Sequence, residues 1–263
     1  MIQNHEIDYK LYGEELQFVE IELDPNETAI AEAGAFMMMD NGIEMQTIFG
    51  DGSEGESGGF LGKLMNAGKR LLVGESLFIT AFTNTSQGKK KVSFASPYTG
   101  KIIVFDLKKL GGKIIAQKDA FLCAAKGVSI GIEFQRKLGT GIFGGEGFIM
   151  EKLEGDGLAF AHAGGYVIER DLLPGEILKV DTGCVVAYTA DVDFDIEMVK
   201  GIKNFMFGGE GLFLAKLTGP GKVWLQSLPI SRLAGRIMQY GNVNRKEEGS
   251  ILGGITNLFD GKE

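Results

Sequence analysis

Three glutamates that follow glycine in a repeated motif are the residues of this sequence whose type and spacing best suggest chemistry. The motif "IFGGEG" at 142–147 recurs as "MFGGEG" at 206–211, and a looser form, "LVGESL", stands at 72–77. The glutamates are Glu75, Glu146 and Glu210. Around a common axis, three carboxylates would bind a cation or a basic partner, or hold raised pKa values through like-charge repulsion. The alternative is that each faces solvent or caps local backbone donors, as surface carboxylates commonly do.

A dinucleotide site is the second chemistry that the glycines suggest. "GTGIFG" at 139–144 matches the dinucleotide-binding fingerprint, which requires a preceding strand, a following helix and a later acidic residue for the ribose. The residues that follow, "GEGFIMEKLEGDGLAFAHA", have the pattern of strand, turn and strand instead. The sequence therefore predicts no nucleotide site and no cofactor.

Metal binding by histidine and cysteine is a third candidate chemistry. The available residues are His5, His162, Cys123 and Cys184, and they lack the spacing of zinc ligands. In the internal repeat described below, Cys184 falls at the position of Phe121, which predicts a buried, core-facing side chain. His162 falls at the position of Gln226, a polar position at a strand end. We therefore predict no metal site.

The segment "DVDFDIE" at 191–197 resembles the start of a calcium-binding loop. Ile196, however, occupies the place where such a loop needs glycine for its sharp turn. The strict alternation instead predicts a strand with an exposed acidic face over the apolar side chains of Val192, Phe194 and Ile196.

The composition favours an all-β protein without affinity for nucleic acid. Of 263 residues, 44% are hydrophobic, and glycine is abundant (40) whereas proline is scarce (5), as in chains with many short strands and turns. The formal net charge of −8 opposes the phosphate attraction behind most nucleic-acid binding. The basic run 89–91 is typical of a solvated hairpin and does not change this expectation.

An internal repeat of 64 residues organises the chain. This spacing separates Gly145 from Gly209, Gly157 from Gly221 and Phe160 from Trp224, and a looser copy precedes them. Units of this length with several strands predict three tandem β-sandwich modules related by pseudo-threefold symmetry, with few short helices. The predicted bounds are 1–100, which includes an inserted loop at 50–74, then 101–165, 166–230, and a short helix and tail at 231–263.

Local signals refine this picture at two places. Asn41-Gly42 stands between two apolar, β-compatible runs, which predicts a tight hairpin with positive φ at both turn residues. Ser231 precedes "RLAGRIMQY" and is predicted to be the N-cap of a helix.

Two apolar segments are candidates for contact with a partner or a membrane surface. A basic, helix-periodic stretch and a glycine-broken tail supply the side chains, which are Phe60, Leu61, Leu64, Leu71, Leu72, Ile251, Leu252, Leu258 and Phe259. The alternative is a helix packed on its own core and a disordered tail.

The expected location is the cytoplasm. The first residues include acids and lack the apolar core of a signal peptide, and no uncharged stretch is long enough to span a bilayer. Two cysteines are too few for a disulfide framework in a chain of this size.

The ordered combination of "GGFLGKLMNAGKRLLVGESLFITAFTN", "FGGEG" twice, and "LPISRLAGRI" resembles the mitochondrial-biogenesis family named for altered inheritance of mitochondria. The resemblance implies a fold like that of the tryptophan RNA-binding attenuation protein, with a small β module in three copies that often assembles into trimers. It implies no catalytic residues, and mitochondrial members are associated with inner-membrane organisation. RNA binding is not carried over, because a shared fold does not transfer function.

These observations together predict a non-enzymatic, oligomeric structural or interaction scaffold, with a homotrimer favoured. The alternative is a small-ligand- or cation-binding protein that uses the glutamates between its modules.

Overall fold

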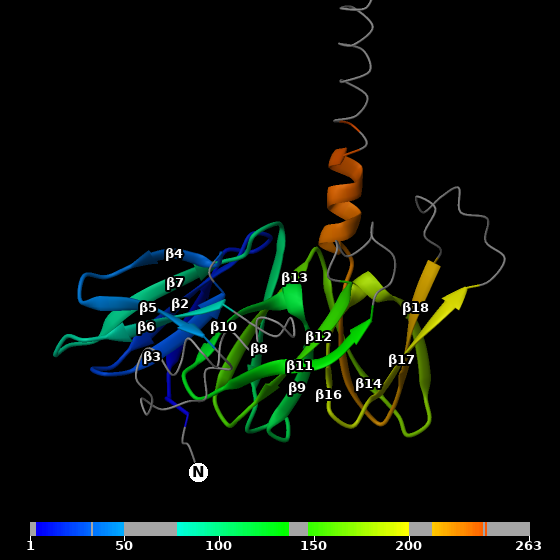
Figure 1. The fold of residues 1–263 in the computed structure, drawn as a ribbon, viewed down its shortest axis with the longest axis horizontal. Helices are drawn as coiled ribbons and strands as arrows, with labels where there is room; N and C mark the ends of the chain where they lie inside the picture. The colour runs from blue at the N-terminus through cyan, green and yellow to red at the C-terminus, as the bar shows by residue number, and fades with distance from the viewer. Residues whose placement is uncertain are drawn as a thin grey trace, which may run out of the picture.

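The computed structural model describes residues 4–32, 34–49, 78–136, 147–199, 212–238 and 240. In this part of the chain, antiparallel β-strands dominate and a helix occupies 230–238, so the predicted all-β class is confirmed (Figure 1). No helix among the described residues has both the length and the apolar character needed to cross a bilayer.

The strands fall into three consecutive blocks of six. Block 1 contains β2 (Phe18–Leu23), β3 (Thr28–Glu32), β4 (Phe36–Met39), β5 (Ile43–Phe49), β6 (Phe78–Asn84) and β7 (Lys90–Ala95), and β1 (Asp8–Tyr12) precedes it. Block 2 contains β8 (Gly100–Asp106), β9 (Lys113–Gln117), β10 (Phe121–Ala125), β11 (Ser129–Arg136), β12 (Phe148–Glu154) and β13 (Leu158–Gly164), with the 3-10 turn η1 (Lys118–Ala120). Block 3 contains β14 (Val167–Leu172), β15 (Ile177–Asp181), β16 (Val185–Thr189), β17 (Asp193–Val199), β18 (Leu212–Thr218) and β19 (Gly221–Gln226), with η3 (Thr182–Cys184).

Hydrogen bonds join strands of neighbouring blocks into shared sheets. The four sheets have the orders β1-β2-β7-β4, β5-β6-β3-β10-β13-β8, β11-β12-β9-β16-β19-β14 and β15-β18-β17. In every block the first, sixth and third strands are neighbours, and so are the fourth, fifth and second. The pairing pattern therefore repeats three times, whereas the predicted pseudo-threefold rotation and module boundaries stay predictions.

Two equivalent joints connect the blocks, each formed by the second strand of one block and the third strand of the next. At the first joint, β3 pairs with β10 and Ala31 lies opposite Cys123. At the second, β9 pairs with β16 and Ala116 lies opposite Ala187. We call these pairings joint 1 and joint 2. Through these pairings the strands of successive blocks continue one sheet.

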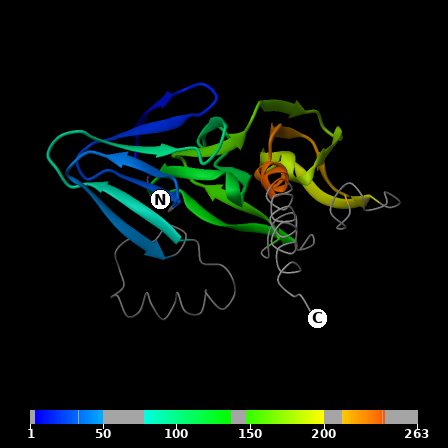
Figure 2. The same cartoon turned by 90° about the horizontal axis from the view of Figure 1, so that it is seen from above.

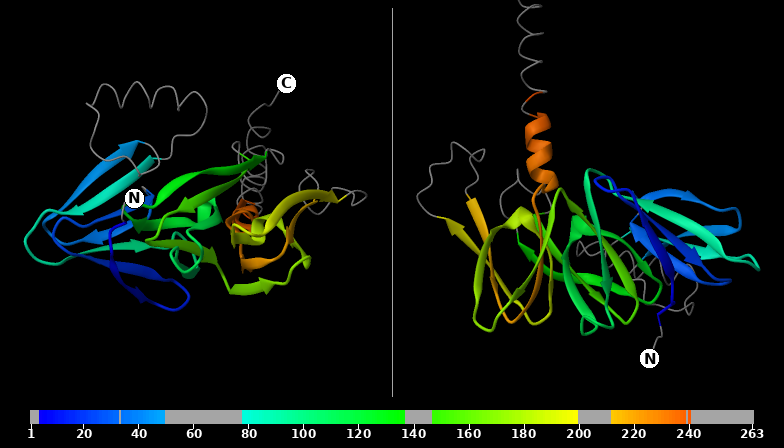
Figure 3. Two further views of the ribbon diagram at one scale, coloured as in Figure 1. Left: turned by 90° about the horizontal axis from the view of Figure 1, so that it is seen from below. Right: turned by 180° about the vertical axis from the view of Figure 1, so that it is seen from behind.

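Three hydrophobic cores lie between successive sheets (Figures 2 and 3). Each core draws apolar side chains from both of the sheets that enclose it, since side chains on a strand alternate between the two faces. The largest fully buried side chains are phenylalanines, namely Phe82, Phe94, Phe105, Phe148 and Phe160. The blocks are therefore held by face-to-face packing as well as by strand pairing.

The structure corrects the predicted hairpin at Asn41-Gly42. A turn is present, but β4 pairs with β7 and β5 pairs with β6, so the flanking strands belong to different sheets. Gly42 has a φ of 100°, whereas Asn41 is not among the residues with positive φ, so the turn lacks the geometry of a tight hairpin. The turn instead carries the chain from one sheet to the sheet that faces it.

Two further expectations concern the third block and the helix. The alternating segment forms strand β17, in which Ile196 is buried and Phe194 half-buried, and Val192 is buried just before the strand begins, as predicted. The helix begins at residue 230, and the carbonyl of Pro229 accepts a hydrogen bond from the amide of Leu233. Ser231 thus lies inside the first turn, and its predicted role as N-cap is wrong.

Candidate functional site

The side chains predicted to bind a ligand or partner lie outside the described residues. These are Glu75, Glu146 and Glu210 of the repeated motif, and the apolar residues Phe60, Leu61, Leu64, Leu71, Leu72, Ile251, Leu252, Leu258 and Phe259. The structure does not test them, and they stay predictions.

The candidate site that the structure does describe is a pair of adjoining cavities at the two joints. A cavity of about 440 Å³ lies at joint 1, where Glu32, Ala35, Phe121 and His162 contribute to its wall. A cavity of about 170 Å³ lies at joint 2. The two share the side chains of Tyr98, Asp119, His162 and Ile230, so they form one continuous recess beside the start of the helix.

The two cavities occupy equivalent positions in the repeat. Glu32 and Gln117 are the last residues of β3 and β9, and each lines the cavity of its own joint. The cavities are also lined by His162 of β13 at joint 1 and by Gln226 of β19 at joint 2. His162 follows Phe160 by two residues and Gln226 follows Trp224 by two, and the strand register aligns Phe160 with Trp224. The equivalence of His162 and Gln226 proposed from the sequence therefore agrees with the strand register.

Gln226 at joint 2 has both ends of its amide hydrogen-bonded. Its Oε1 accepts from the backbone amide of Gly164 at 2.7 Å, and its Nε2 donates to the carbonyl of Gly183 at 2.9 Å. Since Gly164 ends β13 and Gly183 lies in η3, the side chain ties neighbouring elements together. Gln226 thus has a structural role that accounts for its burial.

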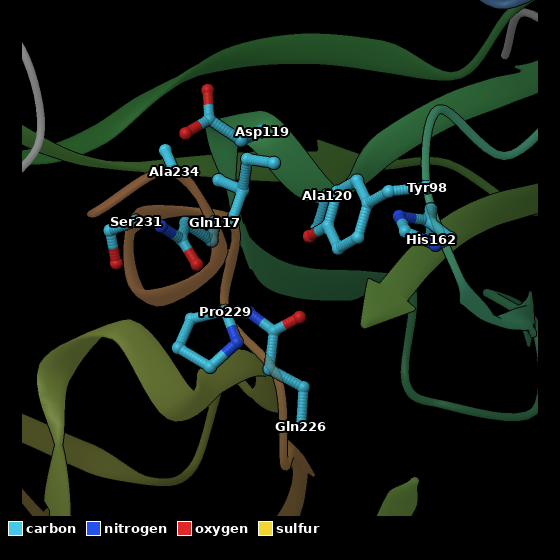
Figure 4. Close-up of a pocket in the computed structure, with 10 residues that line it drawn as sticks. Tyr98, Gln117, Asp119, Ala120, His162, Gln226, Pro229, Ser231 and Ala234 are labelled. Atoms are coloured by element: carbon cyan, nitrogen blue, oxygen red, sulfur yellow. The ribbon is translucent and has the colours of Figure 1, made fainter. Parts of the chain in front are cut away.

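His162 at joint 1 is buried without equivalent bonds. The residue is 2% exposed, and neither imidazole nitrogen has a hydrogen-bond partner of good geometry. The Tyr98 ring packs edge-on against it with centroids 4.4 Å apart, and Figure 4 shows the two rings side by side on the wall of the recess. A buried polar group without a partner costs about 1–3 kcal/mol, so the His162 imidazole is less well bonded than the Gln226 amide.

The protonation states of the two rings follow from their burial. Loss of hydration lowers the pKa of His162 to about 4, with the backbone of Tyr98 opposing the change, so the imidazole is neutral at pH 7. Burial raises the pKa of Tyr98 to about 12; the charge of Asp119 adds to this rise and a backbone hydrogen bond with Ile230 opposes it. Both rings therefore act as neutral dipoles in the physiological range.

Two carboxyl groups, Glu32 and Asp119, line the recess, and a third, Glu151, lies close enough to interact with both. Burial raises the pKa of Glu32, and the negative charge of Asp119 adds to the increase. Glu151 of β12 lies behind them, 1% exposed, with Oε1 lacking a hydrogen-bond partner. Burial raises its pKa to about 8, Lys118 opposes the shift, and Glu32 and Asp119 add to it.

This arrangement suits binding of a polar or cationic group. A neutral imidazole accepts or donates one hydrogen bond, and carboxylates attract positive charge. Among the described residues, no group of three His, Cys, Asp or Glu side chains is placed to hold a metal ion.

Sequence reasoning located part of this site and missed the rest. The register matches Val185, rather than Cys184, with Phe121, so the predicted core position of Cys184 was wrong by one residue. Cys184 is half-buried, and Arg232 approaches its sulfur. Glu32, Asp119 and Glu151 were not predicted. Glu32 reaches joint 1 through the pairing of blocks 1 and 2, and Asp119 and Glu151 belong to the same block as His162 but come from other elements of its fold.

The fold and the recess define an all-β protein built from repeated, edge-joined blocks with a polar cavity at each internal joint. The chain belongs to the family described as mitochondrial biogenesis AIM24, whose model matches residues 9–228. The family suggested by the sequence motifs is therefore confirmed.

Two proteins of Streptococcus pyogenes illustrate the similarity. The chain is 28% identical over 225 residues to an uncharacterised protein of a serotype M6 strain, covering 84% of this chain and 86% of that protein. A structural-genomics crystal structure of a second S. pyogenes protein superposes with a TM-score of 0.68 at 24% identity, covering 89% of this chain and 99% of the other. The latter supports the fold alone. The implied likeness to the tryptophan RNA-binding attenuation protein is tested by neither match and stays a prediction.

Proposed function

We propose that this protein is a non-enzymatic structural or interaction scaffold that assembles head to tail with further copies of itself, a trimer being the expected ring. The observation that carries the proposal is the exposure of two sheet edges, β4 and β15. In the repeat, β4 corresponds to β10 and β16, and β15 corresponds to β3 and β9. These are the strands that form the two joints, yet among the described residues β4 and β15 have no partner across the joint edge.

The side chains of β4 are more exposed than those of its equivalents β10 and β16. All residues of β10 and β16 are buried, whereas all four residues of β4, "FMMM", are exposed. Met38, for example, is 46% exposed, while the equivalent Cys123 and Ala187 are fully buried. An exposed apolar edge strand is a template for pairing with another chain, and sheets normally protect such edges.

The complementary edge is β15. Its equivalents β3 and β9 are buried over most of their length, whereas every residue of β15 is at least partly exposed and Ile177 is 53% exposed. One copy of β4 and one of β15 therefore offer the two halves of a third joint. Main-chain hydrogen bonds and burial of the apolar side chains would stabilise it.

The register of the missing joint follows from the two that exist. Ala31 and Ala116 are the fourth residues of β3 and β9, and they face the third residues of β10 and β16. The fourth residue of β15 is Val180 and the third residue of β4 is Met38. Val180 of one copy is thus expected to lie opposite the Met38 position of the next.

The two edges belong to sheets at opposite ends of the molecule (Figure 1). A contact between different edges is heterologous, and it forms a ring when the rotation closes and a filament when it does not. The homotrimer expected from the sequence corresponds to a closed ring of nine blocks.

The mass in solution tests the assembly. Chromatography with light scattering is expected to give a multiple of the chain mass for the natural protein. Met38→Lys is expected to reduce it to that of one chain, because lysine on a sheet edge opposes pairing. Met45→Lys is the matched control, since Met45 is 49% exposed on β5, outside the joint. A natural protein that elutes as one chain would overturn the proposal.

The second edge offers an equally close comparison. Ile177→Lys is expected to dissociate the assembly, whereas Ile168→Lys is expected to leave it intact. The two isoleucines lie in the same block and are 53% and 51% exposed, but Ile168 is on β14, which has no role in the joints. Equal effects of the two changes would argue against a contact through β15.

A designed disulfide tests the register. With Cys184 replaced by serine, a chain carrying Met38→Cys and Val180→Cys is expected to cross-link to its neighbours under mild oxidation, because directly opposed residues lie within disulfide reach. Neither single change is expected to cross-link. Cross-linking by Met38→Cys alone would indicate a symmetric β4–β4 dimer instead.

Two further proposals concern the binding partners and the cellular location of the protein. Contact with a protein partner or a membrane surface through the apolar segments around 60–72 and 251–259 is proposed from the sequence alone. A cytoplasmic location is proposed from the low cysteine content, and the absence of nucleic-acid binding from the net negative charge.

A further inference from the structure

We propose that Met37, Met38 and Met39 of the edge strand β4 are a modification site, at which oxidation by a peroxide controls the assembly of this protein. The inference rests on the proposed head-to-tail contact between β4 and β15. In the free chain the three thioethers accept oxygen, and the resulting sulfoxides prevent β4 from joining the next copy. In the assembled protein the same contact shields the sulfur atoms.

Methionine occurs in the exposed joint strand and not in the buried ones. The sequence of β4 is "FMMM", whereas its equivalents β10 and β16 are "FLCAA" and "VVAYT". The strands β3 and β9, which complete the two joints within the chain, also lack methionine, and so does β15. A thioether is a flexible apolar group that oxidation makes polar. These groups therefore lie at the one joint strand that is open to the oxidant in a single chain.

The three side chains are accessible to a small oxidant before assembly. All three are exposed on β4, at the end of the molecule shown on the left in Figure 1, whereas Met150 in the core is fully buried. A peroxide must reach the sulfur atom to react, so the methionines of β4 react readily in the free chain and Met150 is protected by the fold.

The strand register places the thioethers on both faces of the joint edge. Met38 lies opposite Ser93 of β7, and Met39 lies opposite Val92, which belongs to the core. Directly opposed residues of antiparallel strands point to the same face of a sheet, so Met39 shares the core-facing side and Met38 points to the other. Met37 lies at the irregularity between them and Phe36. A sulfoxide on either face therefore stands beside the edge where β15 would pair.

The reaction consumes one peroxide molecule per methionine. The sulfur lone pair attacks one oxygen of hydrogen peroxide, so that an S–O bond forms while the O–O bond breaks. The proton on the transferred oxygen passes to the departing hydroxide, which leaves as water. The sulfur is thereby oxidised to a sulfoxide and the second peroxide oxygen is reduced to water. Methionine sulfoxide reductases reverse the change, so the modification is suited to regulation.

A sulfoxide opposes the joint because it is polar. The strand that it would meet, β15, presents the apolar side chains of Ile177 and Val180. Burial of a polar group without a hydrogen-bond partner is unfavourable, whereas burial of the thioether is favourable. One sulfoxide on β4 is therefore expected to weaken the association of two copies by about tenfold or more.

Peroxide treatment of the full chain, with Cys184 replaced by serine, tests the proposal. The protein is oxidised over a dilution series and quenched with catalase. Light scattering then gives the mass, and peptide mass spectrometry gives the sulfoxide at each methionine. Dilute protein is expected to be oxidised on β4 and then to have the mass of one chain. Where the untreated protein is assembled, oxidation of Met38 should be at least about tenfold slower, whereas that of the exposed Met238 in the helix should be unchanged.

Leucine variants separate the thioether from the shape of the side chain. Leucine is close to methionine in volume and does not react with peroxide. The chain with Met37→Leu, Met38→Leu and Met39→Leu is expected to assemble and to keep its assembled mass after treatment. The matched control carries Met198→Leu and Met238→Leu, both exposed outside β4, and is expected to dissociate like the natural protein. The thermal midpoint should be retained throughout, which shows that the mass changes without unfolding.

The mass of the untreated protein separates this proposal from the assembly on which it rests. A single-chain mass before treatment would overturn both. An assembled protein that keeps its mass when Met38 is fully oxidised would overturn the switch and leave the assembly standing. The switch would also fail if the leucine variant of β4 dissociated as the natural protein does, or if β4 gained no sulfoxide at any dilution.

Discussion

Replacing Glu151 by glutamine is expected to stabilise this protein at neutral pH. The residue is 1% exposed on β12, and one carboxylate oxygen lacks a hydrogen-bond partner. Burial raises its pKa from 4.5 in the unfolded chain to about 8. Between these values the folded protein holds a proton that the unfolded chain has released. The free energy of unfolding therefore falls as the pH rises through this interval.

The magnitude follows from the size of the shift. Each pKa unit corresponds to about 1.4 kcal/mol, so the cost at pH 7 is about 3 kcal/mol and the full cost above pH 8 is about 5 kcal/mol. Glutamine resembles the protonated acid in shape and carries no charge at any pH. The difference in stability between Glu151→Gln and the natural protein should be near zero at pH 4.5 and should widen steadily towards pH 8.

Urea unfolding at pH 5, 6, 7 and 8 measures this difference. Glu44→Gln is the control, because Glu44 is an exposed carboxylate on a strand of block 1 and its replacement should give little change at any pH. A Glu151→Gln difference that is constant with pH, or a loss of stability at pH 7, would refute the account of Glu151 as a carboxyl group held neutral by burial.

Two other changes follow from the same region. Because burial lowers the pKa of His162 to about 4 from 6.5, the natural protein should lose up to about 3 kcal/mol between pH 6.5 and pH 4, and urea curves should show that His162→Gln removes most of this loss. Gly100→Ala should cost about 2 kcal/mol or more, because its β-carbon would overlap the carbonyl of Ala163 and lie 2.7 Å from Nε2 of His162. Gly88→Ala, where nothing lies within 4 Å, should be nearly neutral in the same thermal unfolding assay.

The repeat and the strand content were predictable because both are local properties of the chain. Turn glycines and alternating apolar residues recur every 64 residues, and Ile196 with its neighbours forms the strand that the alternation indicates. The positions of His162 and Gln226 in the repeat were also evident from spacing alone. Such signals depend on residues that are close together along the chain, and they can therefore be read directly from the sequence.

The pairing between blocks was not predictable, because it depends on contacts that local patterns do not encode. The run at 36–49 has the signature of a hairpin, yet its halves enter facing sheets. The same limit explains the carboxylates. Glu151 stands in "FIMEKLE", where alternation gives no reason to expect burial. It becomes buried because it shares a face of β12 with Leu153, and that face packs against the second six-stranded sheet. The raised pKa of Glu151 is a product of this packing between sheets.

The joint positions differ in their polar groups. At joint 1, Glu32 ends β3 and β13 carries His162, whose ring nitrogens lack hydrogen bonds of good geometry. At joint 2, Gln117 and Gln226 stand at these positions, and Gln226 bonds to the backbone. A third joint between β15 and β4 of successive copies would place Asp181 at the position of Glu32, and Ala95 at the position of His162 by strand register. Asp181 already lies 3.5 Å from Arg232. If the proposed assembly forms, its joint would therefore hold a carboxylate beside an arginine of the same chain, unlike either joint within the chain.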